Sequence, residues 1–274
     1  MRGLLVLLIV YNNLPAPQAP EAAAGGKPGT GTAWGMACVV RGLEKTLLFD
    51  TGGDGDLLVA NMRAMGVDPR SIEVVFLSHA HRDHTGGLDA VLELNPGAEV
   101  WLHSGFPRQV IERAERAGAQ VRVVEDEPVR VLPGAYSTGV LVTGGLHTPG
   151  PGSSIPEQAL VLNAPGGLVV LTGCSHPGVV HMARAALDAG ERFSDELISS
   201  RLLLVTGGFH LGGAGAQEVR DISGLFRGLG VEYLGPNHCT GDRAIRIFRQ
   251  EWGDRFVETG CGAVLEIGET VRAR

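Results

Sequence analysis

Two patterns of apolar and polar positions run through this chain of 274 residues. Short apolar runs bounded by Gly, Pro or Asn are typical of buried strands, whereas apolar residues three and four positions apart indicate amphipathic helices. The short runs predict strands over residues 3–10, 34–40, 46–50, 72–77, 99–102, 120–124, 129–132, 139–142, 158–163, 168–171, 202–205, 232–234 and 263–267. The helical spacing predicts helices over residues 57–65, 88–94, 107–117, 179–187, 216–229 and 243–252.

The order of these elements predicts an α/β fold. Predicted hairpins at residues 34–50 and 158–171 each precede an alternation of strands and helices. Two such successions favour two mixed β-sheets packed face to face with helices on both outer faces, a four-layer αββα sandwich. Because no repeat or linker divides the chain, we predict a single domain over residues 1–274.

Composition narrows the range of functions. The formal net charge of −7 disfavours a nucleic-acid partner, because phosphate contacts need clustered Lys and Arg. The four cysteines are widely scattered, which is not a disulfide framework, so a reducing compartment is expected. The sequence leaves the oligomeric state open.

A histidine-rich loop follows the predicted strand 72–77 and carries the strongest chemical signal. Three histidines and one carboxylate lie within six residues: His79, His81, Asp83 and His84. Imidazole and carboxylate are ligands of divalent metals, and crowding them is costly without a cation among them. An extended backbone points His79 and His81 the same way, while Asp83 and His84 lie on the following turn. This spacing predicts two metal ions.

Further histidines each follow an apolar strand and a glycine-rich turn. Loops at strand ends meet in α/β folds, so these side chains are expected to converge on the same site. They are His176, His210 and His238.

The whole set of motifs resembles the metallo-β-lactamase superfamily, which carries a His-x-His-x-Asp-His signature. The resemblance rests on residues 46–52 (Thr-Leu-Leu-Phe-Asp-Thr-Gly), 79–84, 172–178 (Thr-Gly-Cys-Ser-His-Pro-Gly), 207–211 (Gly-Gly-Phe-His-Leu) and 238–241 (His-Cys-Thr-Gly). It is similar in particular to the branch of 7,8-dihydropterin-6-yl-methyl-4-(β-D-ribofuranosyl)aminobenzene 5′-phosphate synthases and related metal-dependent hydrolases. The resemblance implies the same αββα fold.

The resemblance also implies a ligand set. His176 would complete the first metal site with His79 and His81, and His238 would complete the second with Asp83 and His84. Cys174 stands where other members of the superfamily carry a bridging Asp, so it is either a zinc ligand or a buried, inert thiol.

His147 offers an alternative to His176. Its surroundings, Leu146-His147-Thr148-Pro149-Gly150, resemble the Gly-His-Thr-Pro-Gly ligand turn of glyoxalase II-like members. His176 is the favoured ligand of the two. His103 and His181 are expected to be surface or packing histidines.

Other residues are expected to support the chemistry. Asp50 would accept the N–H of a ligand imidazole or cap its own turn. Asp83 is assigned a catalytic as well as a ligand role, and His210 is a candidate general acid or substrate contact. Arg82 and Arg243 flank the metal motifs and are candidates for holding an anionic substrate group.

The first apolar run has two interpretations. Arg2 and the Ala-Pro-rich sequence after the run are typical of a signal peptide at residues 1–20. The alternative is a first buried strand, which the resemblance favours because the related branch begins with one; a cytoplasmic location then follows. The run is too short to span a membrane. Residues 15–32 are expected to form a loop beside the site or a mobile flap.

These observations predict a dinuclear metal-dependent hydrolase acting on a small, phosphorylated or ester-type substrate through a metal-bridging hydroxide. Zinc is the expected metal, with manganese or iron as alternatives. The resemblance leaves two other functions open: a transferase like the dihydropterin–ribosylaminobenzene phosphate synthases, and a non-catalytic metal-binding protein. The expected partner is a small molecule, with no nucleic acid and no membrane.

Overall fold

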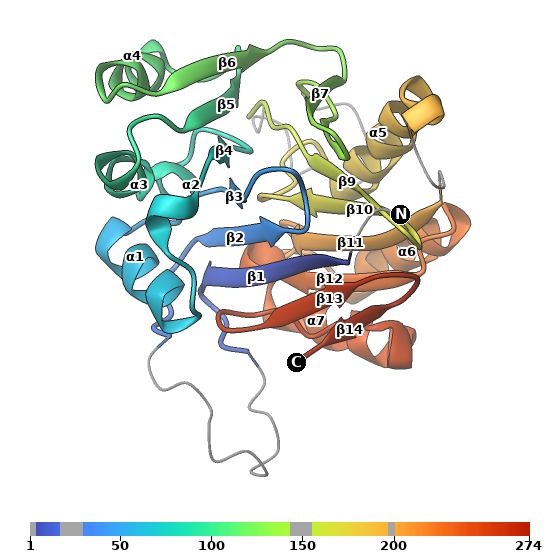
Figure 1. Ribbon diagram of the computed structural model, residues 1–274. Helices are drawn as coiled ribbons and strands as arrows, with labels where there is room; N and C mark the ends of the chain where they lie inside the picture. Colours follow the sequence, from blue (N-terminus) through green and yellow to red (C-terminus); the bar gives the residue numbers. More distant parts are fainter. Residues whose placement is uncertain (1–3, 17–29, 143–154, 197–200) are drawn as a thin grey trace.

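Two mixed β-sheets form the centre of the molecule (Figure 1). The computed structural model describes residues 4–16, 30–142, 155–196 and 201–274. The eight-stranded sheet has the order β14-β13-β1-β2-β3-β4-β5-β6. Its strands are β1 (Leu5–Asn12), β2 (Met36–Arg41), β3 (Leu47–Phe49), β4 (Val74–Phe76), β5 (Glu99–His103), β6 (Gln120–Val124), β13 (Val264–Ile267) and β14 (Val271–Ala273).

The six-stranded sheet has the order β12-β11-β10-β9-β8-β7. β10, β11 and β12 are parallel, whereas the pairs from β10 to β7 are antiparallel. Its strands are β7 (Val129–Leu132), β8 (Ala135–Ser137), β9 (Leu160–Ala164), β10 (Gly167–Thr172), β11 (Leu202–Gly208) and β12 (Tyr233–Asn237).

Helices cover the outer face of each sheet, as Figure 1 shows. The helices α1 (Gly55–Ala64), α3 (Leu88–Leu94) and α4 (Arg108–Arg116) pack on the eight-stranded sheet, and α5 (Val179–Arg192), α6 (Ala216–Gly228) and α7 (Asp242–Trp252) on the other. The short helix α2 (Arg82–Thr85) and the 3₁₀ turns Pro69–Ser71, Ser194–Glu196, His238–Thr240 and Gly253–Arg255 connect these elements. The predicted αββα sandwich is confirmed.

The alternation of side chains along each strand explains why the apolar runs are continuous. In β1, Leu7 and Ile9 belong to the core between the sheets, while Leu8 and Val10 pack toward the helices. Successive side chains of a strand point to opposite faces, and both faces of these sheets are covered. Burial on both sides therefore requires apolar residues at successive positions.

The strands of the structure differ from the predicted ones in several places. The predicted strand 139–142 is wrong: only Leu141 forms an isolated bridge, with Glu157. Gly139 has φ +77°, and a Cβ there would lie 2.2 Å from the carbonyl oxygen of Asp126, so the chain turns at this point. Two short strands, β8 and β14, were not predicted. The strand predicted from residue 34 begins only at Met36.

Several expectations concern the ends of the described ranges. The strand interpretation of the first apolar run is confirmed, since β1 pairs with β13 and β2. Residues 1–3 and 17–29, which include part of the predicted signal peptide and most of the predicted flap, lie outside the described residues, as does His147. Each helix in the described ranges falls short of the length and apolarity that a bilayer crossing requires.

Candidate metal centre

The predicted ligand side chains all come from loops at one end of the two sheets. β4 leads into the loop of His79 to His84, β10 ends just before Cys174 and His176, β11 before His210, and β12 before His238. The eight-stranded sheet supplies the first of these loops and the six-stranded sheet supplies the others.

The first group contains His79, His81 and His176. His79 Nε2 lies 3.1 Å from His81 Nδ1. The ring of His176 lies 4.7 Å from that of His79 and 4.9 Å from that of His81, measured between centroids. The ligand atoms of His79, Cys174 and His176 lie within 4.8 Å of one another.

The second group contains Asp83, His84, Cys174 and His238. His84 Nε2 lies 3.2 Å from His238 Nε2 and 3.3 Å from Cys174 Sγ. Asp83 Oδ2 lies 3.6 Å from His84 Nε2 and 3.4 Å from His238 Nε2. All four ligand atoms lie within 4.8 Å of one another, and because Cys174 is also within 4.8 Å of His79 and His176, its thiol lies where the two groups meet.

The outer nitrogens of three imidazoles, those of His84, His176 and His238, are each held by a hydrogen-bond acceptor. The Nδ1 atoms of His84 and His176 lie 2.7 and 2.9 Å from carboxylate oxygens of Asp50 and Glu157. His238 Nδ1 lies 2.8 Å from the Oδ1 atom of Asn13, whose amide donates to the His238 carbonyl.

These contacts assign the tautomers, because an imidazole that donates through Nδ1 carries a lone pair on Nε2. Lone pairs of His84 and His238 therefore face each other beside the carboxylate of Asp83. Such an arrangement is repulsive unless a cation lies among the atoms. The donor set thus fits divalent metal ions.

Titration of the buried groups points the same way. Burial, together with the neighbouring histidines, lowers the pKa of His79 well below its usual value, so its imidazole is neutral, as a ligand must be. For His84, burial opposes a charge, but the adjacent Asp50 carboxylate outweighs burial and raises the pKa. Burial opposes ionisation of Asp83 too, yet the hydrogen bond and charge of His238 and the charge of His84 lower its pKa. The carboxylates of Asp50 and Asp83 therefore favour a positive charge at the second ligand group.

Asp50 has the supporting position expected for it. Its Oδ1 accepts the backbone N–H of Ser78, and its Oδ2 accepts the Ser78 hydroxyl, each at 2.7 Å. The same Oδ2 contacts His84, and the Ser78 hydroxyl oxygen lies 2.9 Å from His79 Nδ1. One fully buried carboxylate therefore orients an imidazole of each ligand group, one directly and one through Ser78.

Glu157 is the main residue that the sequence analysis missed. Its Oε1 accepts backbone N–H groups of Gly173, Cys174 and Ser175, and its Oε2 accepts both the N–H and the Nδ1 of His176. Burial opposes the ionised form, but His79, His176 and these donors lower the pKa of Glu157. No sequence signal beyond its position just before a strand marks this residue.

The backbone around the centre is strained. Within the described ranges, the non-glycine residues with positive φ are Asp50 (54°), Ser175 (64°), His210 (53°) and His238 (48°). Three of them are candidate site residues and the fourth lies between Cys174 and His176. Such conformations cost free energy and persist where the surrounding structure imposes them, often at functional sites.

A pair of thiols lies at the edge of the centre, with His210. The ligand atoms of Cys174, His210 and Cys239 lie within 4.8 Å of one another, and the His210 ring lies 4.7 Å from that of His176. His210 is exposed, and a hydrogen bond to Cys239 raises its pKa above the usual value. A hydrogen bond with Cys239 raises the pKa of the Cys174 thiol, and burial of the thiol raises it further.

The remaining candidates lie farther from the ligand atoms. Arg82 is exposed at the start of α2, and Arg243 donates to the carbonyl of Ala214 at 3.5 Å. His103 is buried at the end of β5 and His181 is half-buried in α5, in line with packing roles.

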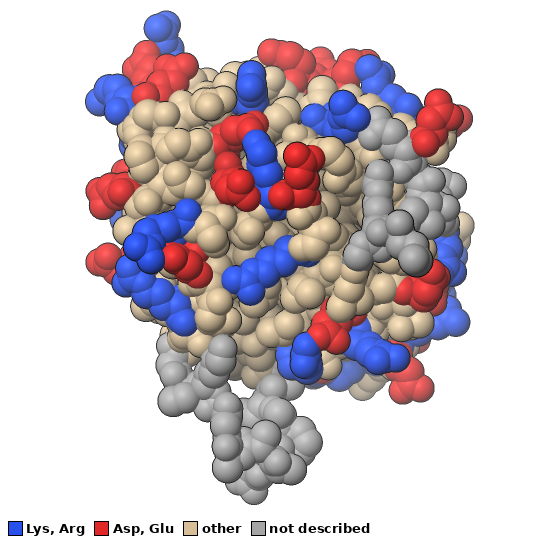
Figure 2. Space-filling model, viewed as in Figure 1, with Lys and Arg blue, Asp and Glu red and all other residues tan. Residues whose placement is uncertain are grey.

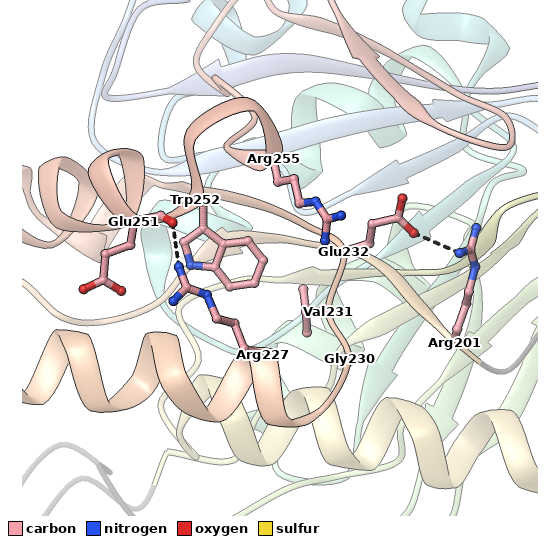
Figure 3. A pocket seen from close by; sticks show the side chains of 8 residues that line it. All are labelled: Arg201, Arg227, Gly230, Val231, Glu232, Glu251, Trp252 and Arg255. Carbon is pink, nitrogen blue, oxygen red and sulfur yellow. Dashed lines mark hydrogen bonds and ion pairs between the residues drawn. The ribbon is translucent and has the colours of Figure 1, made fainter.

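A separate hollow of about 480 Å³ lies at the opposite ends of β11 and β12 (Figure 3). Arg201 pairs with Glu232 at 3.0 Å, and Arg227 donates to the Glu251 carbonyl while lying over the ring of Trp252. Arg227 thus satisfies a backbone carbonyl in the last turn of α7, and the charges of Arg201 and Glu232 offset each other within the hollow. It is therefore distinct from the histidine cluster and carries none of its chemistry.

Comparison with known proteins identifies the family. Residues 35–181, which include His79 to His84 and His176, match the Metallo-beta-lactamase superfamily. The chain belongs to this superfamily. The fold of this superfamily typically binds divalent metals, and the two groups described above supply candidate ligands for such ions.

Individual relatives refine the comparison. The structure is similar to that of Tm1679, a metal-dependent hydrolase of the beta-lactamase superfamily, with a TM-score of 0.74, 27% identity, and coverage of 96% of this chain and 99% of the other. The 7,8-dihydropterin-6-methyl-4-(beta-D-ribofuranosyl)-aminobenzene-5'-phosphate synthase of Methanocaldococcus jannaschii is 26% identical over 259 residues, 82% of this chain and 85% of the relative. A diphosphatase from the PhnP family, 14% identical with a TM-score of 0.59, covers 97% of this chain and 98% of its own, and shares the fold.

Proposed function

We propose that this chain is a dinuclear metal-dependent hydrolase of a small phosphorylated or ester-type substrate. The observation that carries the proposal is the meeting of two ligand groups at Cys174, with the Nε2 atoms of His84 and His238 facing each other at 3.2 Å. Similarity to the hydrolase Tm1679 over nearly the whole chain supports it.

The first ion would be held by His79, His81 and His176, and the second by Asp83, His84 and His238, with the Cys174 thiol between them. Nitrogen, oxygen and sulfur donors together suit zinc, and thiolates bind iron as well, whereas manganese prefers oxygen donors. When bound, such ions supply Lewis acidity and lower the pKa of a coordinated water.

Side chains around the ligands would position and protonate the substrate. Asp50, Ser78 and Glu157 fix the orientation of the imidazoles, so the site is organised before substrate enters. His210 is exposed at the edge of the cluster and can deliver a proton to a leaving group. Arg82 forms no ion pair with the described residues, which leaves its guanidinium free for an anionic group.

A small-molecule partner is the second part of the proposal. Lys and Arg side chains are interspersed with Asp and Glu on the face drawn in Figure 2, rather than gathered in one basic stripe. Phosphate backbones of nucleic acids bind to clustered positive charge, so this surface favours a small substrate over a nucleic acid or an anionic membrane.

One experiment tests the function directly. Metal is measured per chain, and the zinc-, manganese- and iron-loaded proteins are then offered activated phosphodiesters, lactones and thioesters. We expect two equivalents of metal and turnover of one substrate class, with turnover lost in Asp83→Asn but kept in Asp188→Asn, the same change at an exposed position of α5.

Two other outcomes identify the competing functions. Absence of turnover in all loaded forms would overturn the hydrolase and favour a synthase-like transferase, which the similarity to the Methanocaldococcus jannaschii synthase supports. Turnover that persists unchanged in Asp83→Asn would place the chemistry elsewhere and leave the cluster as a non-catalytic metal site.

A further inference from the structure

Trp34 is the most exposed of the large hydrophobic side chains in the described ranges. Its exposed fraction is 60%, compared with 48–56% for Leu4, Val123 and Val142. Single exposed apolar residues are common on protein surfaces, so exposure alone carries no functional meaning. The position of this indole is what distinguishes it.

The indole lies beside the second ligand group. Its ring centroid is 4.9 Å from that of His238, with the two planes tilted by 53°. The same imidazole has its Nε2 atom 3.4 Å from the carboxylate of Asp83. Trp34 therefore contacts a candidate metal ligand with part of its surface and leaves the larger part open.

The backbone around Trp34 is held against the metal-binding loop. Gly35 has φ +134°, and a Cβ at this position would lie 2.3 Å from the carbonyl oxygen of Asp83. A Cβ on Gly53 would lie 3.3 Å from the carbonyl oxygen of Trp34 itself. Only glycine allows this close approach at Gly35, so the position of the indole is set by the same loop that carries Asp83.

We propose that Trp34 forms a binding platform for a planar aromatic or heteroaromatic group of the substrate. The inference rests on the proposed function, because it places that group next to the reacting centre. Large aromatic faces stack with flat rings and lose little conformational entropy in doing so. A site that ends in an open indole beside its metal ligands therefore selects substrates with a flat ring.

A matched pair of carboxylates tests this platform in the zinc-loaded full-length protein. 2-Naphthoate and decahydro-2-naphthoate carry the same carboxylate and differ in the planarity and aromaticity of the ring. We expect the wild type to bind 2-naphthoate about tenfold more tightly, in line with stacking on one aromatic side chain. Isothermal titration calorimetry is the suitable method, because removing the indole also removes its fluorescence.

Three variants separate stacking from other effects. In Trp34→Ala the preference for 2-naphthoate should disappear, while Trp34→Phe should keep most of it. Val123→Ala, at an apolar side chain 48% exposed on β6, should leave both affinities unchanged. Equal binding of the two ligands by the wild type, or an undiminished preference in Trp34→Ala, would overturn the proposal.

The test also separates this inference from the proposed function. Turnover is measured beside the binding of the two carboxylates, and the control Val123→Ala should leave kcat unchanged because this side chain lies on β6, outside the candidate metal centre. If the zinc-loaded protein prefers 2-naphthoate through Trp34 but hydrolyses none of the substrates, the platform is supported and the hydrolase is overturned. Turnover without any preference for the aromatic ring would support the hydrolase and overturn the platform.

Discussion

Two buried carboxylates organise the histidine cluster at the scale of single residues. Asp50 contacts His84 and Ser78, and Glu157 contacts His176 and three further backbone donors. Burying a carboxylate is costly unless it is fully hydrogen-bonded or paired with positive charge. The first condition is met for Glu157 by the peptide groups of residues 173–176 and by Nδ1 of His176, so this carboxylate holds a candidate ligand together with the turn that carries it.

Glu157→Gln should weaken metal binding by about 10- to 100-fold, because a neutral amide oxygen accepts the N–H of His176 more weakly than the charged carboxylate does. Zinc affinity measured by competition with a chelator checks the expectation. The exposed Glu125→Gln is the control, since that side chain lies away from the cluster. Unchanged zinc affinity in Glu157→Gln would show that the turn holds His176 without the carboxylate.

His103 should make stability depend on pH. Burial lowers its pKa from 6.5 to about 4 in the folded protein. As pH falls below 6.5, His103 binds a proton in the unfolded chain but stays neutral in the folded chain. Protonation therefore stabilises the unfolded state, and the free energy of unfolding falls between neutral pH and pH 4. We expect about 2 kcal/mol of unfolding free energy to be lost through His103 between pH 7 and pH 5.

Urea unfolding of the wild type and of His103→Gln at both pH values measures this effect. The substituted chain cannot titrate at position 103, so its loss between pH 7 and pH 5 should be smaller by about the same amount. Parallel losses in the two proteins would mean that His103 is protonated in the folded state or reaches solvent.

At the scale of elements, the apolar pattern predicts most strands because both faces of each sheet are buried. It fails where a strand is short or polar. β8 has three residues, and β14 lies at a sheet edge with exposed Arg272 and Ala273. Neither has a run long enough to distinguish it from a turn.

The candidate site was predictable to a similar extent. The motifs that include His79, His84 and His238 identify candidate ligands because their residue types and spacing are local in sequence. The positions of Glu157 and Asn13 depend instead on which strands become neighbours: β9 pairs with β10, and β1 brings Asn13 to the turn after β12. Such pairings come from the tertiary fold, which no short stretch of sequence encodes.

Gly208→Ala should disrupt the junction of β10 and β11. A Cβ at Gly208 would lie 2.4 Å from the Gly173 carbonyl oxygen and 2.7 Å from Cys239 Sγ. Because the backbone must move, we expect a loss of about 2 kcal/mol in unfolding free energy and weaker metal binding. Gly213→Ala is the matched control, since nothing lies within 4 Å of its Cβ. Equal stability of the two variants would contradict the tight packing at Gly208.

At the scale of the whole molecule, the proposed ions would join the two sheets. The loop after β4 belongs to the eight-stranded sheet, whereas His176 and His238 follow strands of the six-stranded sheet. Ligands that bind only the folded state stabilise it according to their concentration and affinity. Metal binding should therefore stabilise the packing of one half of the molecule on the other.

Removal of metal by a chelator should lower the thermal midpoint by roughly 10 °C. The expectation follows from about 4 kcal/mol of linked stabilisation when free metal is 1,000 times its dissociation constant, at about 2–4 °C per kcal/mol for a chain of this size. Differential scanning calorimetry with and without chelator measures the shift, and Asp83→Asn should reduce it. A thermal midpoint that is the same with and without chelator would mean that the cluster binds no ion tightly.

The place of β1 has a consequence for synthesis on the ribosome. This strand lies between β2 and β13, so one of its edges pairs within the first 41 residues and the other waits for residues 264–267. At typical elongation rates the intervening chain takes on the order of tens of seconds to appear. Throughout that interval an apolar strand has an open hydrogen-bonding edge, which is the kind of edge that pairs with other chains. The nascent protein is therefore most exposed to aggregation until its last strands leave the ribosome.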